Sequence, residues 1–173
     1  MQFVILGLLM MRPMSLYDLH AQFSAGPSLF YSASFGSIHR ALRQLVAQGL
    51  VTVDDAPGST RGRKLHTPTA AGVDAWREWM HEPIGGSNAE TAMLAKVYLL
   101  GLLEDGEERR RAVAVLKAGV TEELSALRGV AADLDSTEIP QEYAGIFRYQ
   151  RATLDYGLRS HELALAWLDD LEE

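Results

Sequence analysis

The sequence predicts a mainly helical protein with one short β-hairpin, and three observations support this fold class. Apolar residues recur at helical spacing along most of the 173 residues. A β-branched segment at 50–53 and a second short segment at 63–67 flank a loop that contains glycine and arginine. After residue 106, two long helical patterns follow one another with a break at 135–140. We therefore expect an N-terminal domain of helices and a hairpin, followed by a domain of long helices.

Four helices are expected in the N-terminal domain. The first is the apolar run 3–10, which ends ahead of a proline because the residue before proline disfavours helix. Ser15 is placed to cap the second helix, and Asp18 suits the positive end of its dipole. Ser34 or Ser32 caps the third helix. The expected inward stripe of this third helix consists of Phe35, Ile38, Leu42, Leu45 and Val46.

A hairpin and a fourth helix complete the expected N-terminal domain. Gly49 is suited to end the third helix in the left-handed conformation. Residues 50–53 and 63–67 then form the two strands, and Thr69 can cap the fourth helix. The apolar positions of that helix are Val73, Trp76, Trp79 and Met80. This order of helices and hairpin is typical of a winged helix-turn-helix domain.

The second domain is expected to contain three helices and no strand. Residues 82–88 contain proline and paired glycine without apolar periodicity, so we place the domains at 1–82 and 88–173. Beyond this linker, apolar residues at intervals of three and four form seams of coiled-coil type. Two helices of about 30 residues would each be about 45 Å long, too long for one chain to cover. We therefore expect these helices to form a homodimer.

Composition limits the class of protein. No cysteine occurs, which removes disulfides and thiolate metal sites. The longest uncharged apolar run, at 3–11, has nine residues, whereas a membrane helix needs about 20. We therefore predict a soluble cytoplasmic protein that does not bind membranes. The histidines lack metal-ligand spacing, and neither a nucleophile motif nor a phosphate-binding glycine motif is present. We predict no metal, no cofactor and no enzymatic activity.

Charge is distributed unevenly along the chain. The net charge is −7, which by itself argues against a nucleic-acid partner. Residues 1–80, however, contain seven basic and five acidic residues, a net +2, whereas residues 81–173 contain nine basic and eighteen acidic residues, a net −9. Such an asymmetry indicates a nucleic-acid-facing N-terminal half.

The third helix has an outer face suited to a DNA groove. Ser37, Arg40, Arg43 and Gln44 lie opposite the apolar stripe. Short polar and forked cationic side chains are the types that read base edges and contact phosphates. An ordinary solvated helix face would look the same, and the neighbouring hairpin favours the DNA interpretation.

The loop between the strands carries a second cationic group. Arg61, Arg63 and Lys64 lie among small residues that let the backbone approach a phosphate. The alternative is a solvated loop. The position beside the third helix favours a wing that contacts the DNA backbone.

Aromatic residues near the linker admit two interpretations. Helical spacing alone explains Trp76, Trp79 and Tyr98 as core or dimer contacts. The same three side chains can instead line a flat hydrophobic pocket for an effector.

Several motifs resemble the PadR family of bacterial transcriptional regulators in order and spacing. They are Ile5-Leu-Gly-Leu-Leu9, Pro13-Met-Ser-Leu-Tyr-Asp-Leu19, Phe35-Gly-Ser-Ile-His-Arg-Ala-Leu42, Gly49-Leu-Val51, Arg61-Gly-Arg-Lys64 and Thr69-Ala-Ala-Gly72. The long helical C-terminal half is similar to the form of the family with a larger dimerisation domain. The resemblance implies a homodimeric repressor that binds a palindromic operator and is released by a small hydrophobic or phenolic effector. Its third helix would enter the major groove while its wing touches the backbone.

The sequence departs from the family pattern at four positions. His39 and His66 stand where the family has tyrosine, Ser37 replaces threonine, and Leu16 replaces glycine. Imidazolium adds positive charge against phosphate, so DNA binding is expected to rise as the pH falls through the histidine range.

A sequence-specific DNA-binding repressor is therefore the predicted function. The alternative is a ligand-binding or protein-interaction module that uses the winged fold for protein contact. The predicted DNA-binding residues are Tyr17, Ser34, Ser37, His39, Arg40, Arg43, Arg61, Arg63 and Lys64.

Overall fold

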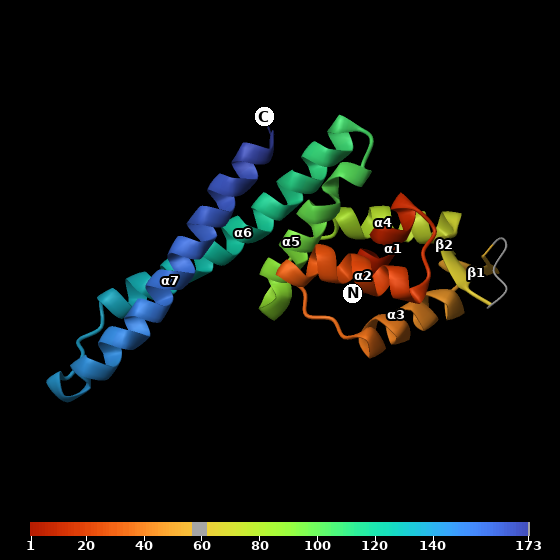
Figure 1. The fold of residues 1–173 in the computed structure, drawn as a ribbon. Coiled ribbons are helices and arrows are strands. Elements are labelled where there is room, and N and C mark those ends of the chain that lie inside the picture. Colours follow the sequence, from red (N-terminus) through yellow and green to blue (C-terminus); the bar gives the residue numbers. More distant parts are fainter. Residues whose placement is uncertain (57–61, 173) are drawn as a thin grey trace. The chain divides into compact units, whose positions relative to one another are not determined.

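A computed structural model of the chain describes residues 1–56 and 62–172, and this part is mainly helical with one β-hairpin (Figure 1). The fold class predicted from the sequence is confirmed. The helices are α1 (Gln2–Met11), α2 (Leu16–Ala25), α3 (Phe35–Ala47), α4 (Ala70–His81), α5 (Ala89–Leu99), α6 (Gly106–Asp135) and α7 (Ala144–Asp169). The strands are β1 (Val51–Asp55) and β2 (Lys64–Pro68). Short 3-10 turns occur at Pro27–Leu29, Gly86–Asn88, Leu100–Leu102, Gln141–Tyr143 and Asp170–Glu172.

Capping residues set the beginnings of three helices where the sequence predicted them. Ser15 and Asp18 form a capping box at α2, in which each side chain bonds the other residue's backbone N–H. Ser34 caps α3 by accepting from Ser37 N, and Thr69 caps α4 by accepting from Gly72 N. Gly49 follows α3 with a φ of 72°, the left-handed conformation expected of a C′ glycine.

The first compact unit comprises Met1–Glu82 and Ser87–Ala112, and α1 lies at its centre. Every residue of α1 from Val4 to Leu9 is buried, and the helix contacts α2, α3, α4 and α5. Gly7 makes this packing possible, because a Cβ there would lie 2.7 Å from a Leu99 methyl and 3.0 Å from the Trp76 ring nitrogen. The apolar first helix of the sequence is therefore the core helix of this unit.

Phe35 departs from the expected inward stripe of α3. Ile38, Leu42 and Leu45 are buried, but the Phe35 side chain is 37% exposed. It is the first residue of α3, and its ring lies 5.4 Å from the rings of Tyr17 and His20 on α2. The prediction for Phe35 was wrong because its contacts are with α2 side chains at the surface and not with the core.

The hairpin is a two-stranded antiparallel sheet. Val53 pairs with His66 and Asp55 with Lys64. An isolated bridge between Met14 and His66 attaches β2 to the segment before α2, with backbone hydrogen bonds of 3.2 and 2.9 Å. The hairpin is therefore hydrogen-bonded to the segment before α2 at one point along β2.

The second compact unit comprises Pro83–Gly86 and Val113–Glu173 and is built on α6 and α7. Figure 1 shows these two helices antiparallel and side by side. Ion pairs connect them at Lys117–Asp169 (2.5 Å) and Arg128–Glu162 (2.9 Å), and His161 Nε2 lies 3.1 Å from Glu123 Oε2. Three helices and no strand follow residue 88 up to residue 172, as predicted.

Two apolar faces run along α7. Helical spacing predicts an apolar seam for the last long helix, and its members Phe147, Leu154, Leu158, Leu165 and Leu168 are buried or half-buried. The prediction was wrong for Tyr143, which lies in the 3-10 turn before α7 and is 55% exposed. A second row comprises Ile146, Tyr149, Tyr156 and Leu163, and all four side chains are exposed. The spacing of three and then seven residues puts this second row on one helix face. We call these four residues the α7 seam.

The compact units do not follow the division at 82–88. Residues 87–112 belong to the first unit and residues 83–86 to the second. The functional division into domains at 1–82 and 88–173 stays a prediction. Within the described residues, no helix combines the length and apolarity needed to cross a membrane.

Candidate nucleic-acid interface

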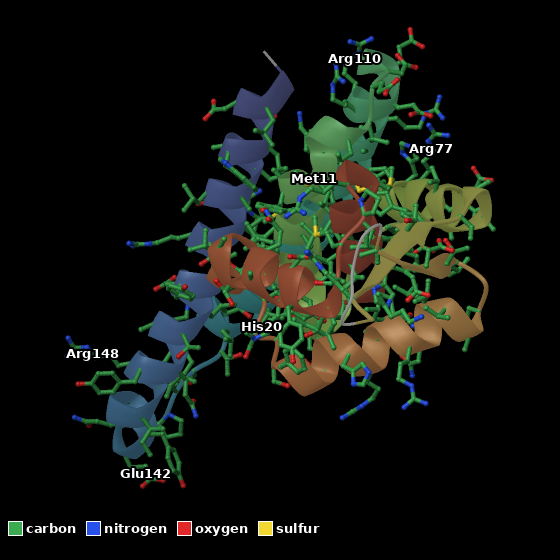
Figure 2. All side chains as sticks on the ribbon, turned by 45° about the vertical axis from the view of Figure 1, so that its right-hand side comes forward. Met11, His20, Arg77, Arg110, Glu142 and Arg148 are labelled. Carbon is green, nitrogen blue, oxygen red and sulfur yellow. The ribbon has the colours of Figure 1, made fainter. Side chains whose placement is uncertain are left out.

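The outer face of α3 presents a row of polar and cationic side chains. Ile38, Ala41, Leu42 and Leu45 are buried on the inner side, which fixes the helix to the core. On the other side His39, Arg40, Arg43 and Gln44 are exposed. We call these four residues the recognition face. Together with Gly36 and Ala47 they line a shallow hollow of about 400 Å³. Figure 2 shows nitrogen-tipped side chains projecting outward from α3.

Ser34 and Ser37 lie at the beginning of α3 and are engaged in capping. The Ser34 hydroxyl accepts from Ser37 N at 3.2 Å, and the Ser37 hydroxyl donates to Ser34 O at 2.7 Å. These bonds hold both serines at the positive end of the helix dipole, where backbone N–H groups favour anions.

The wing consists of β1, β2 and the connecting residues 56–63. Lys64 Nζ lies 2.7 Å from Asp55 Oδ1 across the hairpin, and both side chains remain largely exposed. Arg63 precedes β2 and is also exposed. Arg61, predicted as a third wing cation, lies outside the described residues.

Asp18 connects the wing to α2. Arg63 Nη2 lies 2.6 Å from Asp18 Oδ2, and the same oxygen accepts from the backbone N and the hydroxyl of Ser15 at 2.8 and 2.7 Å. These contacts, led by the hydrogen bond from the Ser15 hydroxyl, lower the pKa of Asp18 to about 2. Asp18 therefore keeps its negative charge throughout the physiological pH range. We call the Asp18–Arg63 pair the wing clamp.

A groove of about 530 Å³ lies between the beginning of α2 and the wing. It is lined by Ser15, Leu16, Tyr17, Asp18, Gly62, Arg63, Lys64 and His66. Tyr17 is 77% exposed. The structure thus brings Tyr17, Arg63 and Lys64 of the predicted set together at this groove, while the recognition face lines the separate hollow on α3.

His66, one of the two histidines at positions where the PadR pattern has tyrosine, lies in a partly buried position on β2. Nδ1 of His66 lies 3.1 Å from the backbone oxygen of Met14. Burial lowers the pKa of His66 below its usual 6.5, and the charge of His39 lowers it further. The contact with Met14 acts in the opposite direction. The lowered pKa favours the neutral form of His66, so a gain of charge at this position needs a lower pH than for an ordinary histidine.

The three predicted pocket aromatics occupy different positions. A pocket of about 520 Å³ is lined by Met1, Val4, Phe30, Tyr31, Ser32, Trp79, Asn88, Thr91, Ala92 and Ala95. Trp79 lines it and stacks on Phe3 at 5.2 Å. Trp76 is fully buried in the core, and Tyr98 lies outside the lining with its ring 5.8 Å from that of Phe30.

Sequence reasoning missed Asp18, Phe30 and Tyr31 as site residues. Asp18 was assigned only a helix-dipole role, although the capping pattern Ser15-x-x-Asp18 showed where its carboxylate would lie. Phe30 and Tyr31 lie in an irregular segment without periodicity, so nothing in the sequence indicated which side they face.

The buried α1, the capped α2 and α3, and the hairpin bridged to Met14 define a winged helix-turn-helix protein. The family described as "Virulence activator alpha C-term" matches residues 91–173. The negative transcriptional regulator PadR of Bacillus subtilis (strain 168) is 25% identical over 177 residues, which cover 99% of this chain and 94% of PadR.

Two solved structures of Bacillus subtilis PadR are also similar. The complex with operator DNA is 23% identical with a TM-score of 0.45 and covers 99% of this chain and 97% of that one. The complex with p-coumaric acid is 23% identical with a TM-score of 0.43, and the match covers 99% of this chain and 92% of that one. The sequence match to PadR extends along nearly the whole of both chains, and the C-terminal family match covers the long helices. The chain is therefore similar to a PadR transcriptional regulator along nearly its whole length.

Proposed function

We propose that this protein is a sequence-specific DNA-binding repressor that acts as a dimer in the cytoplasm. One observation carries the proposal, namely the exposed recognition face on a helix whose opposite side is buried in the core. A major groove about 12 Å wide admits such a helix. The wing lies in the same unit and supplies further cations for the DNA backbone.

Side-chain chemistry divides the roles. Arg40 and Arg43 can each bond the O6 and N7 atoms of guanine, and Gln44 can bond adenine in the same two-pronged way. Lys64 and, from the sequence, Arg61 would contact phosphates. Ser34 at the beginning of α3 and Tyr17 are exposed and would make phosphate contacts that fix the register.

The α7 seam supports the dimer. Its four exposed apolar side chains at heptad-like spacing have the form of a helix–helix contact surface. A second copy of the chain would cover them and would present two recognition faces to the two halves of a palindromic operator.

The similar proteins support the proposal that this chain represses transcription and binds a small effector. PadR is a negative transcriptional regulator and has been crystallised with operator DNA and with p-coumaric acid. In this chain, the pocket that Trp79 lines is walled mainly by apolar and aromatic side chains, with Ser32, Asn88 and Thr91 as polar groups. Such a lining suits a flat aromatic compound with one polar end.

The first experiment is an anisotropy titration against the DNA upstream of the protein's own coding region. It should be run at about 50 and about 200 mM salt with random duplex as competitor, because phosphate contacts weaken steeply with salt. A repressor binds tightly, loses affinity with salt and survives the competitor. Binding that shows no preference over random DNA, together with capture of a protein partner, would favour the interaction module instead.

Calorimetric titration with p-coumaric acid tests the effector proposal. Binding should be lost in Ala92→Phe, because the larger side chain fills the pocket. Ala114→Phe, at an exposed position of α6, is the matched control and should bind as the parent protein does. Equal binding by both variants would remove this pocket from the proposal.

A further inference from the structure

The wing clamp joins two segments that are far apart in the sequence. Asp18 and Arg63 are 45 residues apart, yet Nη2 of Arg63 lies 2.6 Å from Oδ2 of Asp18. The same Oδ2 atom receives both capping-box hydrogen bonds from Ser15. One carboxylate oxygen therefore belongs at once to the beginning of α2 and to the base of the wing.

The clamp continues a line of contacts along β2. His66 exchanges two backbone hydrogen bonds with Met14, and Arg63 contacts Asp18 three residues nearer to the tip of the wing. At Arg63 the hairpin also pairs with itself, since Ala56 N donates to Arg63 O. The clamp thus joins the wing to α2 nearer to the tip than the Met14–His66 bridge does.

The negative charge of Asp18 is unfavourable on a surface that binds DNA. Its carboxylate stays ionised and lines the groove that also contains Lys64 and Tyr17. A fixed negative charge near DNA repels phosphate, so its removal should tighten binding. A guanidinium has five N–H donors, however, so Arg63 can be held by Asp18 and still point donors at another acceptor.

We propose that Asp18 is a positioning residue for DNA binding, which fixes the wing through Arg63 in the orientation that lets the wing meet the backbone of the bound duplex. This inference rests on the proposed DNA-binding function. Held by Asp18, the wing loses less conformational freedom when DNA binds, and the affinity rises accordingly.

The DNA test is a double-mutant cycle on Asp18 and Arg63. Asp18→Asn should weaken operator binding by about threefold to tenfold, the range of coupling between contacting residues. In an Arg63→Gln background the same change should have less than about a twofold effect, since the pair is already broken. The capping box is altered in both backgrounds, so its contribution cancels in the comparison.

Asp54→Asn is the matched control for charge. Asp54 is exposed on β1, and removing its charge should leave binding unchanged or tighten it. Tighter binding by Asp18→Asn, as in the control, would overturn the proposal. Equal weakening in both backgrounds would also overturn it and assign the loss to the capping box.

Hydrogen exchange without DNA separates the inference from the proposed function. Backbone amides of residues 64–67 should exchange faster in Asp18→Asn and in Arg63→Gln than in the parent protein. The double variant should exchange no faster than either single variant. Unchanged exchange would overturn the clamp itself. Failure of the parent protein to prefer operator DNA would overturn the proposed function and the DNA role of Asp18, while the exchange result would still decide whether the clamp holds the wing.

Discussion

Arg40 lies in the middle of the recognition face, exposed and flanked by His39 and Arg43. A two-pronged contact with a base contributes about 1–3 kcal/mol of discrimination, so Arg40→Ala should weaken operator binding by about that amount. Competition anisotropy with operator and random duplexes measures the difference. Arg77, which projects from α4 in Figure 2, provides the control, since Arg77→Ala should leave both affinities unchanged. An equal loss on both duplexes would make Arg40 a phosphate contact.

Lys96 is an ionisable side chain inside the first unit. It is 1% exposed, donates to the backbone oxygen of Glu82 and lies 5.3 Å from the Trp79 ring centre. Burial lowers the pKa of Lys96 to about 8. An unfolded lysine has a pKa of about 10.4, so between these values the unfolded chain binds more protons, and stability rises with pH.

Lys96→Met should therefore flatten the pH dependence of thermal unfolding between pH 8 and 10. Circular dichroism melts of the parent and the variant measure it, and the variant should also be the more stable of the two at pH 7, where the parent must bury a charge. Lys64→Met, at an exposed position, should keep the parent's profile. The same rise with pH in Lys96→Met would show that other groups cause it.

At the scale of elements, the beginning of α4 closely approaches Leu50, between α3 and β1, through a glycine. Thr69 N donates to Leu50 O at 3.0 Å, and a Cβ on Gly72 would overlap that carbonyl oxygen. Gly72→Ala should therefore destabilise the protein by about 1–3 kcal/mol, as overpacking does. Gly129→Ala is the opposite case, because nothing lies within 4 Å of a Cβ there. Inside α6 it should stabilise by about 0.5–1 kcal/mol. Urea unfolding gives both values, and a neutral Gly72→Ala would contradict the packing argument.

For the whole molecule, the proposed dimer makes the α7 seam the contact surface between two copies of the chain. Tyr149→Glu places a charge in an apolar contact and should shift the protein from dimer to monomer in analytical ultracentrifugation. Operator affinity should fall with it, because the two recognition faces would no longer be linked. Gln150→Glu adds the same charge beside the seam on an exposed residue and should remain dimeric. A Tyr149→Glu dimer as stable as the parent's would remove the seam from the interface.

The extent to which the sequence predicts this molecule depends on the range of each interaction. Local rules placed Ser15, Ser34 and Thr69 as caps and Gly49 as the C′ residue, because capping involves neighbours within a single turn. The outer face of α3 followed from helical periodicity in the same way.

Contacts between distant segments were beyond this reasoning. The wing clamp depends on how the hairpin lies against α2, which no local pattern encodes. Phe35 satisfied the helical period yet contacts Tyr17 and His20 at the surface, since the first turn of a helix can face a neighbour instead of the core. The pocket that Trp79 lines is also lined by Phe30 and Tyr31, which belong to an irregular segment.

The close packing around Gly7 has a consequence for the fluorescence of the tryptophans. Trp76 is completely enclosed, and its ring nitrogen has no hydrogen-bond partner within the described structure. An indole in such a dry environment emits at short wavelength. Trp167 is half-buried in α7, in the other compact unit. Each unit thus contains an intrinsic fluorophore. In a Trp167→Phe protein all tryptophan emission would come from the first unit, so a shift in emission wavelength would report the unfolding of that unit alone.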